Sequence, residues 1–88
     1  MKVNEVVTVM ASSGEYVGKL TKMDENGIVL KDPRLITFGE QGMGFASGIA
    51  ATGLEDPKEM TILQAVFVTQ THEDVVKAWH RATSGLIL

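Results

Sequence analysis

Hydrophobic and polar residues alternate with a period of two along much of the chain, which is typical of β-strands. Turn-forming residues interrupt the alternation and leave three runs rich in β-branched or aromatic side chains, at residues 6–10, 16–22 and 28–31. The turn before the third run contains Asp24, Asn26 and Gly27, which tolerate the left-handed backbone of a tight reversal. The pattern therefore predicts three successive antiparallel strands.

The next part of the chain departs from this regular alternation. Pro33 cannot donate a hydrogen bond to a sheet, so we expect a bent strand that resumes at Leu35. Residues 39–57 contain five glycines, and near 44–50 one side of an extended chain would be almost bare. This composition is compatible with a fourth strand at 44–50, which another backbone can approach closely, and equally with a loop.

Residues 59–70 have the strongest strand pattern, with apolar side chains at both odd and even positions. We therefore expect one long strand whose two faces are both covered. A change of period follows, because Val75, Trp79 and Ala82 recur at the spacing of a helix. Thr71 is the expected N-cap and Gly85 the expected terminator of a helix over 71–83.

Together these elements predict one mainly β domain that spans residues 1–88. We expect a small, strongly bent, five-stranded barrel of the SH3 type or the related OB type over residues 3–70, closed by the C-terminal helix. A chain of 88 residues has a thin core, and the absence of cysteine excludes disulfides that would staple it. Association with other subunits is the expected source of further stability.

Charge and composition narrow the possible environment. The chain has 8 basic and 11 acidic residues, a net charge of −3, so nonspecific binding of nucleic acid is disfavoured and any such site must be local. We find neither a signal-peptide pattern nor an apolar run long enough for a membrane-spanning helix. The expectation is a soluble, cytoplasmic protein without membrane contact.

The residues that carry most enzyme chemistry have simpler explanations here. His72 and His80 lie eight positions apart on the predicted helix, a spacing that does not bring two ligands to one metal ion. Glu73 and Asp74 match the positive end of the helix dipole. The glycine-rich segment lacks the lysine of a phosphate-binding loop. We therefore expect no enzyme activity, no metal and no cofactor.

Residues 7–32 resemble the first motif of the Sm-like (LSm) family, through Gly14, Gly18, Leu20 and Asp24. The resemblance implies that Gly18 permits a sharp bend in the second strand, that Leu20 points into the barrel and that Asp24 organises the following turn. The helix and the segment 83–87 are similar to small Sm-like proteins encoded by tailed phages. The family's second motif, which ends in Arg-Gly, has no counterpart in this sequence.

One cluster of polar residues is a candidate binding site on the predicted second and third strands. Its members are basic or carry an amide and fall within sixteen positions of one another: Lys19, Lys22, Asn26, Lys31 and Arg34. In the Sm-like resemblance, the amide meets a base edge and the cations meet phosphates of single-stranded RNA or DNA, in support of nucleic-acid processing. A solvated strand face is the simpler reading of the same residues.

Two functions therefore remain open at this point. The chain is either a ring-forming protein that binds single-stranded RNA or DNA, or a structural or assembly module of a phage or other particle that binds no nucleic acid. Both involve association with copies of itself, and the resemblance implies a closed ring of about five to seven subunits.

Overall fold

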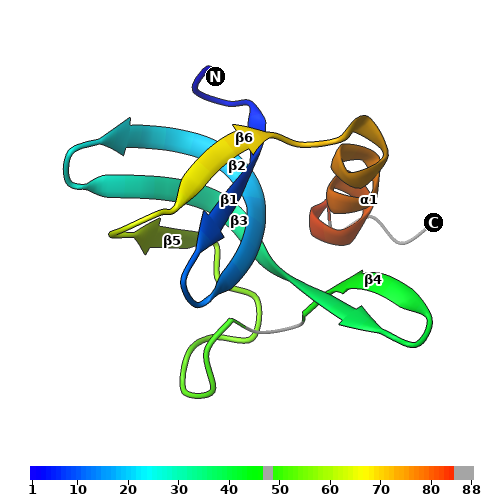
Figure 1. The fold of residues 1–88 in the computed structure, drawn as a ribbon. Helices are drawn as coiled ribbons and strands as arrows, with labels where there is room; N and C mark the ends of the chain where they lie inside the picture. Colours follow the sequence, from blue (N-terminus) through cyan, green and yellow to red (C-terminus); the bar gives the residue numbers. More distant parts are fainter. Residues whose placement is uncertain (47–48, 85–88) are drawn as a thin grey trace.

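The computed structural model describes residues 1–46 and 49–84 and shows a mainly β protein with one C-terminal helix (Figure 1). The elements in chain order are β1 (Val6–Ala11), β2 (Gly14–Asp24), β3 (Gly27–Gly39), β4 (Gly42–Phe45), β5 (Glu59–Ile62), β6 (Phe67–Gln70) and α1 (Glu73–Thr83). The predicted class, β-strands followed by a C-terminal helix, is confirmed.

The strands form one antiparallel sheet, which is not closed into a barrel. The order along the sheet is β4-β3-β2-β1-β6, and β5 pairs with another part of β3. Within the described part of the chain, β5 pairs only with β3 and β6 pairs only with β1. The sheet thus has six strands, where we expected five, and the predicted barrel is not confirmed.

The turn between β2 and β3 forms as the sequence predicts. The side chain of Asp24 accepts a hydrogen bond of 2.8 Å from the backbone N–H of Asn26 through Oδ1. Gly27 adopts a φ of 136°, which side-chain-bearing residues rarely adopt. Leu20, at 2% exposure, lies in the main core of the sheet. Asp24 therefore organises the turn as expected, and Leu20 is buried in the core of an open sheet and not inside a closed barrel.

Strand β3 bends next to Pro33, also as predicted. Lys31 lies opposite Lys19 and Arg34 opposite Val17, so β3 contains an extra residue between these pairs. Asp32 has a φ of 50° at this bulge, and Pro33 is buried. A Cβ on Gly18 would lie 3.3 Å from the Cα of Pro33, so glycine permits the close approach of β2 to the bend.

The fourth strand is shorter and lies earlier than the predicted 44–50. Strand β4 ends at Phe45, residues 49–57 form turns and bends, and residues 47–48 lie outside the described parts of the chain. We call the segment between β4 and β5 the excursion. After it, β5 pairs with the first half of β3, with Lys31 opposite Glu59. Strands β4 and β5 therefore pair with different halves of β3, and the excursion separates them along the chain.

The expectation of one covered strand over residues 59–70 is wrong. The run divides into β5 and β6 because the two halves pair with different strands, β3 and β1, and residues 63–66 connect them. The N–H of Val66 donates a hydrogen bond of 2.7 Å to the carbonyl of Met10, which leads the chain onto β1. Leu63, Val66 and Phe67 remain exposed, so the apolar residues of this run are not covered on both sides.

Helix α1 packs on the sheet through Trp79 and Val75 of the predicted apolar stripe, whereas Ala82 of that stripe is exposed. Trp79 is 3% exposed and lies in a second core with Val6, Val17 and Ile36. Its indole N–H donates a hydrogen bond of 2.9 Å to the carbonyl oxygen of Asp32 at the bulge of β3. The helix thus covers one face of the sheet, and the larger core lies on the other.

The helix begins later than predicted. His72, and not Thr71, is the N-cap, and its Nδ1 accepts a hydrogen bond of 3.1 Å from the N–H of Asp74. The hydroxyl of Thr71 lies instead 2.9 Å from that of Thr8, because the preceding residues are held by β1. Ser84 caps the other end, and the predicted terminator Gly85 lies outside the described residues.

Candidate functional site

Lys19 and Lys31 lie directly opposite each other on β2 and β3. Opposed residues of an antiparallel pair point to the same face, and so do residues two apart on one strand. Val17, two residues before Lys19, packs beneath α1. The two lysines therefore lie on the helix-bearing face, Lys31 exposed and Lys19 half-buried, with Glu59 on the far side of Lys31.

Lys22 and Asn26 lie farther along, at the tip of the β2–β3 hairpin. Lys22 Nζ is 3.4 Å from Asp24 Oδ2, and its side chain is 65% exposed. The hydrogen bond from the Asn26 N–H lowers the pKa of the Asp24 carboxyl below its ordinary value, and the Lys22 ammonium acts in the same direction. The carboxylate at this tip therefore partly neutralises the cation.

A shallow depression of about 220 Å³ adjoins this hairpin tip. It is lined by side chains and backbone of β2, the turn, β3 and β5: Lys22, Asp24, Asn26, Gly27, Val29 and Thr61. The depression brings an ammonium group, an amide and a hydroxyl into one place. These groups are able to hydrogen-bond to a polar ligand, but the carboxylate of Asp24 disfavours an anion there.

Arg34 is separated from the other members of the predicted cluster. Its side chain is only 11% exposed, and Nη1 donates a hydrogen bond of 2.9 Å to the carbonyl of Pro33. Nη2 also lies 3.8 Å from Asp56 Oδ1, in the excursion before β5. The structure therefore brings Lys19 and Lys31 together, places Lys22 and Asn26 at the hairpin tip, and gives Arg34 structural partners.

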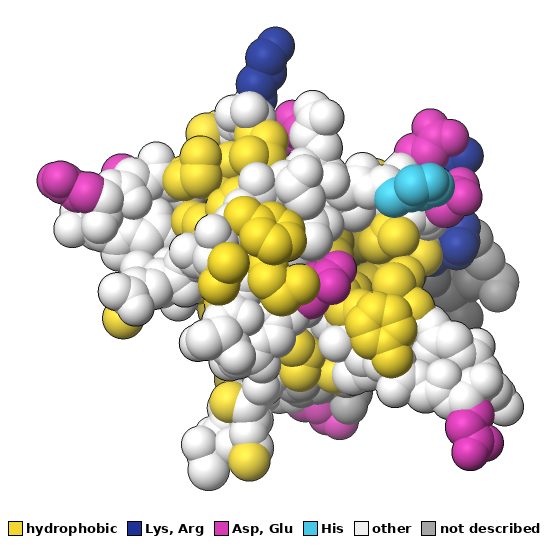
Figure 2. Space-filling view, viewed as in Figure 1, with side chains coloured by type: hydrophobic (Ala, Val, Ile, Leu, Met, Phe, Trp, Pro, Cys, Tyr) yellow, Lys and Arg dark blue, Asp and Glu magenta, His cyan; other side chains and the backbone are white. Residues whose placement is uncertain are grey.

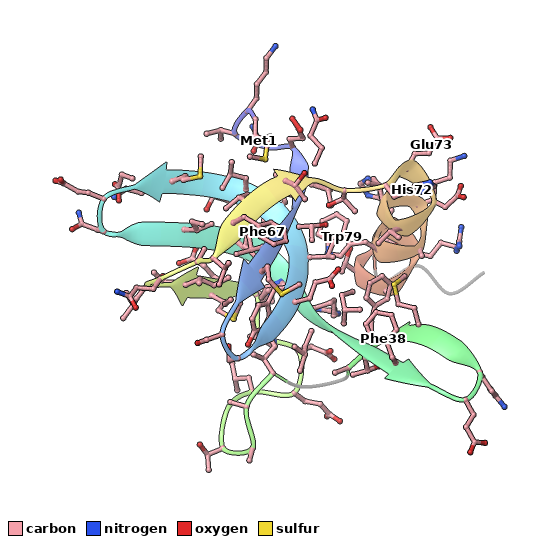
Figure 3. All side chains as sticks on the ribbon, in the orientation of Figure 1. Met1, Phe38, Phe67, His72, Glu73 and Trp79 are labelled. Carbon is pink, nitrogen blue, oxygen red and sulfur yellow. The ribbon has the colours of Figure 1, made fainter. Side chains whose placement is uncertain are left out.

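The sequence reasoning did not identify an exposed apolar surface at the corner between β5 and β6. Leu63, Val66 and Phe67 are 76%, 68% and 50% exposed, and Phe67 lies opposite Met10 on β1. Figure 2 shows hydrophobic side chains gathered on this face, and Figure 3 places Phe67 among them on β6. Apolar residues at both odd and even positions of residues 59–70 are the sequence signal of this surface, but the same pattern predicts a strand covered on both faces. We call these three residues the corner surface.

Two strand edges meet the corner surface. Strand β5 is bonded to β3 on one side and β6 to β1 on one side, so the other side of each carries unpaired backbone groups within the described residues. A cleft of about 680 Å³ lies beside β5, lined by residues 60–64, the β1–β2 turn and Tyr16. The Tyr16 hydroxyl lies 2.7 Å from that of Ser13 across its wall.

Among the described residues, no group of three or more His, Cys, Asp or Glu side chains is arranged to hold a metal ion. In the same residues, no helix is long and apolar enough to cross a membrane.

The fold and these surfaces define a small mainly β protein with an open sheet, a covering helix and two unpaired strand edges beside an apolar corner. No protein-family model matches the chain, and no curated protein matches it either.

Proposed function

We propose that the chain is a non-enzymatic, Sm-like module that assembles with copies of itself into a closed ring. The observation that carries the proposal is the corner surface, where exposed Leu63, Val66 and Phe67 lie between the unpaired edges of β5 and β6. Apolar residues beside open strand edges favour pairing with another chain.

Pairing of β6 from one copy with β5 of the next would use both open edges at once. It would satisfy outward backbone N–H and C=O groups of both strands and remove the corner surface from water. The contact is head-to-tail, so it closes into a ring when the rotation between subunits divides a full turn. The resemblance of residues 7–32 to the Sm-like family supports closure, with about five to seven copies.

Light scattering coupled to size-exclusion chromatography tests this assembly. We expect a single species several times heavier than the 9.5 kDa chain at micromolar concentration. The variant Phe67→Lys, which places a charge beside the β6 edge, should dissociate it. Leu54→Lys is the matched control, because Leu54 is 75% exposed in the excursion before β5 and should leave the mass unchanged. A monomeric unmodified chain would contradict the proposal.

Binding of single-stranded RNA or DNA by the ring is a second candidate function, favoured by one observation. Lys19 and Lys31 are directly opposed like charges, an arrangement that destabilises a sheet, and neither forms an ion pair within the described parts of the chain. A phosphate group between them would relieve the repulsion. Without such binding, the same ring is a structural or assembly module.

Fluorescence anisotropy with labelled oligo-uridine, oligo-adenosine and single-stranded DNA separates these two functions. Binding that weakens with salt and falls about tenfold in Lys19→Glu would support the nucleic-acid function, since the variant loses phosphate contacts. The same substitution creates an opposite-charge pair with Lys31 and should raise the stability by about 0.2–1 kcal/mol. Lys77→Glu, on α1, is the control for net charge, and absence of binding at low salt would leave the assembly function.

A further inference from the structure

The chain contains two asparagines, and they differ in the residue that follows each of them. Asn4 precedes Glu5, whereas Asn26 precedes Gly27 at the tip of the β2–β3 hairpin. Asparagine is chemically labile, because the backbone nitrogen of the next residue can attack its side-chain carbonyl carbon. A side chain on that next residue hinders the attack, and Gly27 has none. Asn26 is therefore the asparagine whose sequence context favours this reaction.

The structure leaves the Asn26 side chain free to react. Asn26 is exposed, and its backbone N–H donates a hydrogen bond of 2.8 Å to Asp24 Oδ1. Its side-chain amide forms no hydrogen bond within the described part of the chain. The amide instead lines the shallow depression at the hairpin tip, which is open to water. No partner among the described residues therefore holds the amide away from the backbone nitrogen of Gly27.

We propose that Asn26 is a modification site, at which the folded protein undergoes spontaneous deamidation. The backbone nitrogen of Gly27 bonds to Asn26 Cγ and gives up its proton. The bond between Cγ and the amide nitrogen breaks, and that nitrogen takes up the proton and leaves as ammonia. Water then opens the resulting succinimide ring, so no other reactant is needed. Opening at Cγ gives aspartate, and opening at the backbone carbonyl carbon gives isoaspartate, in which the main chain runs through Cγ.

Either product changes the charge of the depression at the hairpin tip. The ionisable groups that line it are the ammonium of Lys22 and the carboxylate of Asp24, whose Oδ2 lies 3.4 Å from Lys22 Nζ. Deamidation replaces the neutral amide of Asn26 by a second carboxylate. The depression then has a net negative charge, which disfavours any anion there and repels the Asp24 carboxylate.

Isoaspartate should also disturb the backbone, whereas aspartate should not. Isoaspartate adds one carbon atom to the main chain between residues 26 and 27, where Asp24 and Gly27 pair across the turn. Gly27 lies close to β5, because a Cβ on it would be 2.7 Å from the backbone oxygen of Ile62. The longer main chain has little room there, so isoaspartate should weaken the tip of the hairpin and its contact with β5.

Peptide mapping tests the proposed modification in the unmodified chain. The protein is kept folded in mildly alkaline buffer and then digested with trypsin, which separates Asn26 in residues 23–31 from Asn4 in residues 3–19. Mass spectrometry should show deamidation of residues 23–31 before any is detected in residues 3–19. Protein isoaspartyl methyltransferase with labelled S-adenosylmethionine should label the same peptide, and Asn26→Ser should abolish the labelling. Deamidation of Asn26 only in urea, or equal deamidation of Asn4, would overturn the proposal.

Urea denaturation separates the effect of the charge from that of the longer main chain. Asn26→Asp supplies the carboxylate without the additional backbone carbon. The isoaspartate form, isolated from the aged protein by ion exchange, should have an unfolding equilibrium constant about tenfold higher than that of Asn26→Asp, which is about 1.4 kcal/mol. Aged Asn26→Ser is the control and should keep its original urea midpoint. Equal stability of the isoaspartate form and Asn26→Asp would refute the effect on the backbone.

Discussion

Gly27 shows how a single residue permits the hairpin between β2 and β3. Its φ is 136°, and a Cβ at this position would lie 2.7 Å from the backbone oxygen of Ile62 on β5. Side-chain-bearing residues are therefore disfavoured twice, by the backbone conformation and by the neighbouring strand. Because the obstacle is backbone, a rotamer change cannot relieve it.

We predict that Gly27→Ala lowers the free energy of unfolding by about 2 kcal/mol. Gly39→Ala is the control, because a Cβ at Gly39 meets nothing within 4 Å, and the change there should stay within about 0.5 kcal/mol. Urea denaturation followed by the fluorescence of Trp79 measures both. Equal effects of the two substitutions would show that the approach of β5 to the turn does not matter.

Asp24 gives the same hairpin a pH dependence. Its carboxylate accepts from the Asn26 N–H and faces Lys22, which together lower its pKa below the ordinary value of 3.8. A group whose pKa falls on folding stabilises the folded state above its unfolded pKa, and this contribution is lost as the pH falls through the folded pKa. The turn should therefore weaken only in acid.

We predict that Asp24→Ala is less stable than the unmodified chain at neutral pH, and that the difference shrinks as the pH falls below 3.8. Asp24→Asn keeps the oxygen acceptor without the charge and should lie between the two at neutral pH. Urea midpoints measured across this pH range test the sign. A difference that is constant with pH would mean that the charge contributes nothing.

At the scale of elements, β3 organises the fold because it pairs with three other strands. Its bulge at Asp32 turns the strand so that β5 lines its first half and β4 its second half. The same bulge presents the Asp32 carbonyl to the indole of Trp79. The bend next to Pro33 therefore helps to fix the position of α1, because it presents the carbonyl that Trp79 binds.

Trp79 is the contact that should matter most for docking of α1. We predict that Trp79→Ala costs about 3–5 kcal/mol, because it removes a large buried side chain from the core beneath the helix. Trp79→Phe retains most of the apolar surface but loses the hydrogen bond to Asp32, and should cost about 1–2 kcal/mol. Urea denaturation followed by circular dichroism measures both, and equal losses would deny the hydrogen bond a role.

At the scale of the whole molecule, the strands at the edges of the sheet, β4, β5 and β6, determine where another strand can pair with it. The central strands β1, β2 and β3 have partners on both sides, whereas β4, β5 and β6 each have a single partner within the described chain. The apolar corner surface lies beside two of these single-partner strands. The fold therefore has central strands that are paired on both sides and outer strands that each leave one side open within the described chain.

We predict that the proposed ring assembly changes hydrogen exchange unevenly across this sheet. Amides of β1 and β2 should exchange slowly at all protein concentrations, because both edges of these strands are paired. Amides of β5 and β6 should gain protection as concentration rises and copies associate, whereas β4 should not. Mass spectrometry of peptic fragments measures this, and uniform protection of β4, β5 and β6 would contradict pairing through β5 and β6.

Much of the fold could be predicted from local patterns. The period of two and the turn residues predict the first three strands, Pro33 predicts the bend, and the spacing of Val75 and Trp79 predicts the helix. These features depend on neighbours in the sequence, through backbone conformations that Gly, Pro and Asp allow or prevent. The candidate cluster was predicted less well, since Lys19 and Lys31 meet but Arg34 is held by Pro33 and Asp56.

By itself, the sequence determined where the chain extends, reverses and coils, because the free energy of these choices depends on each residue and its nearest neighbours. Only the tertiary structure decided that the apolar run at 59–70 divides between β3 and β1, leaving Phe67 exposed. It likewise decided that β4 is a short edge strand. Pairing between strands joins residues far apart in the chain, so periodicity shows which residues are apolar but not which partner covers them.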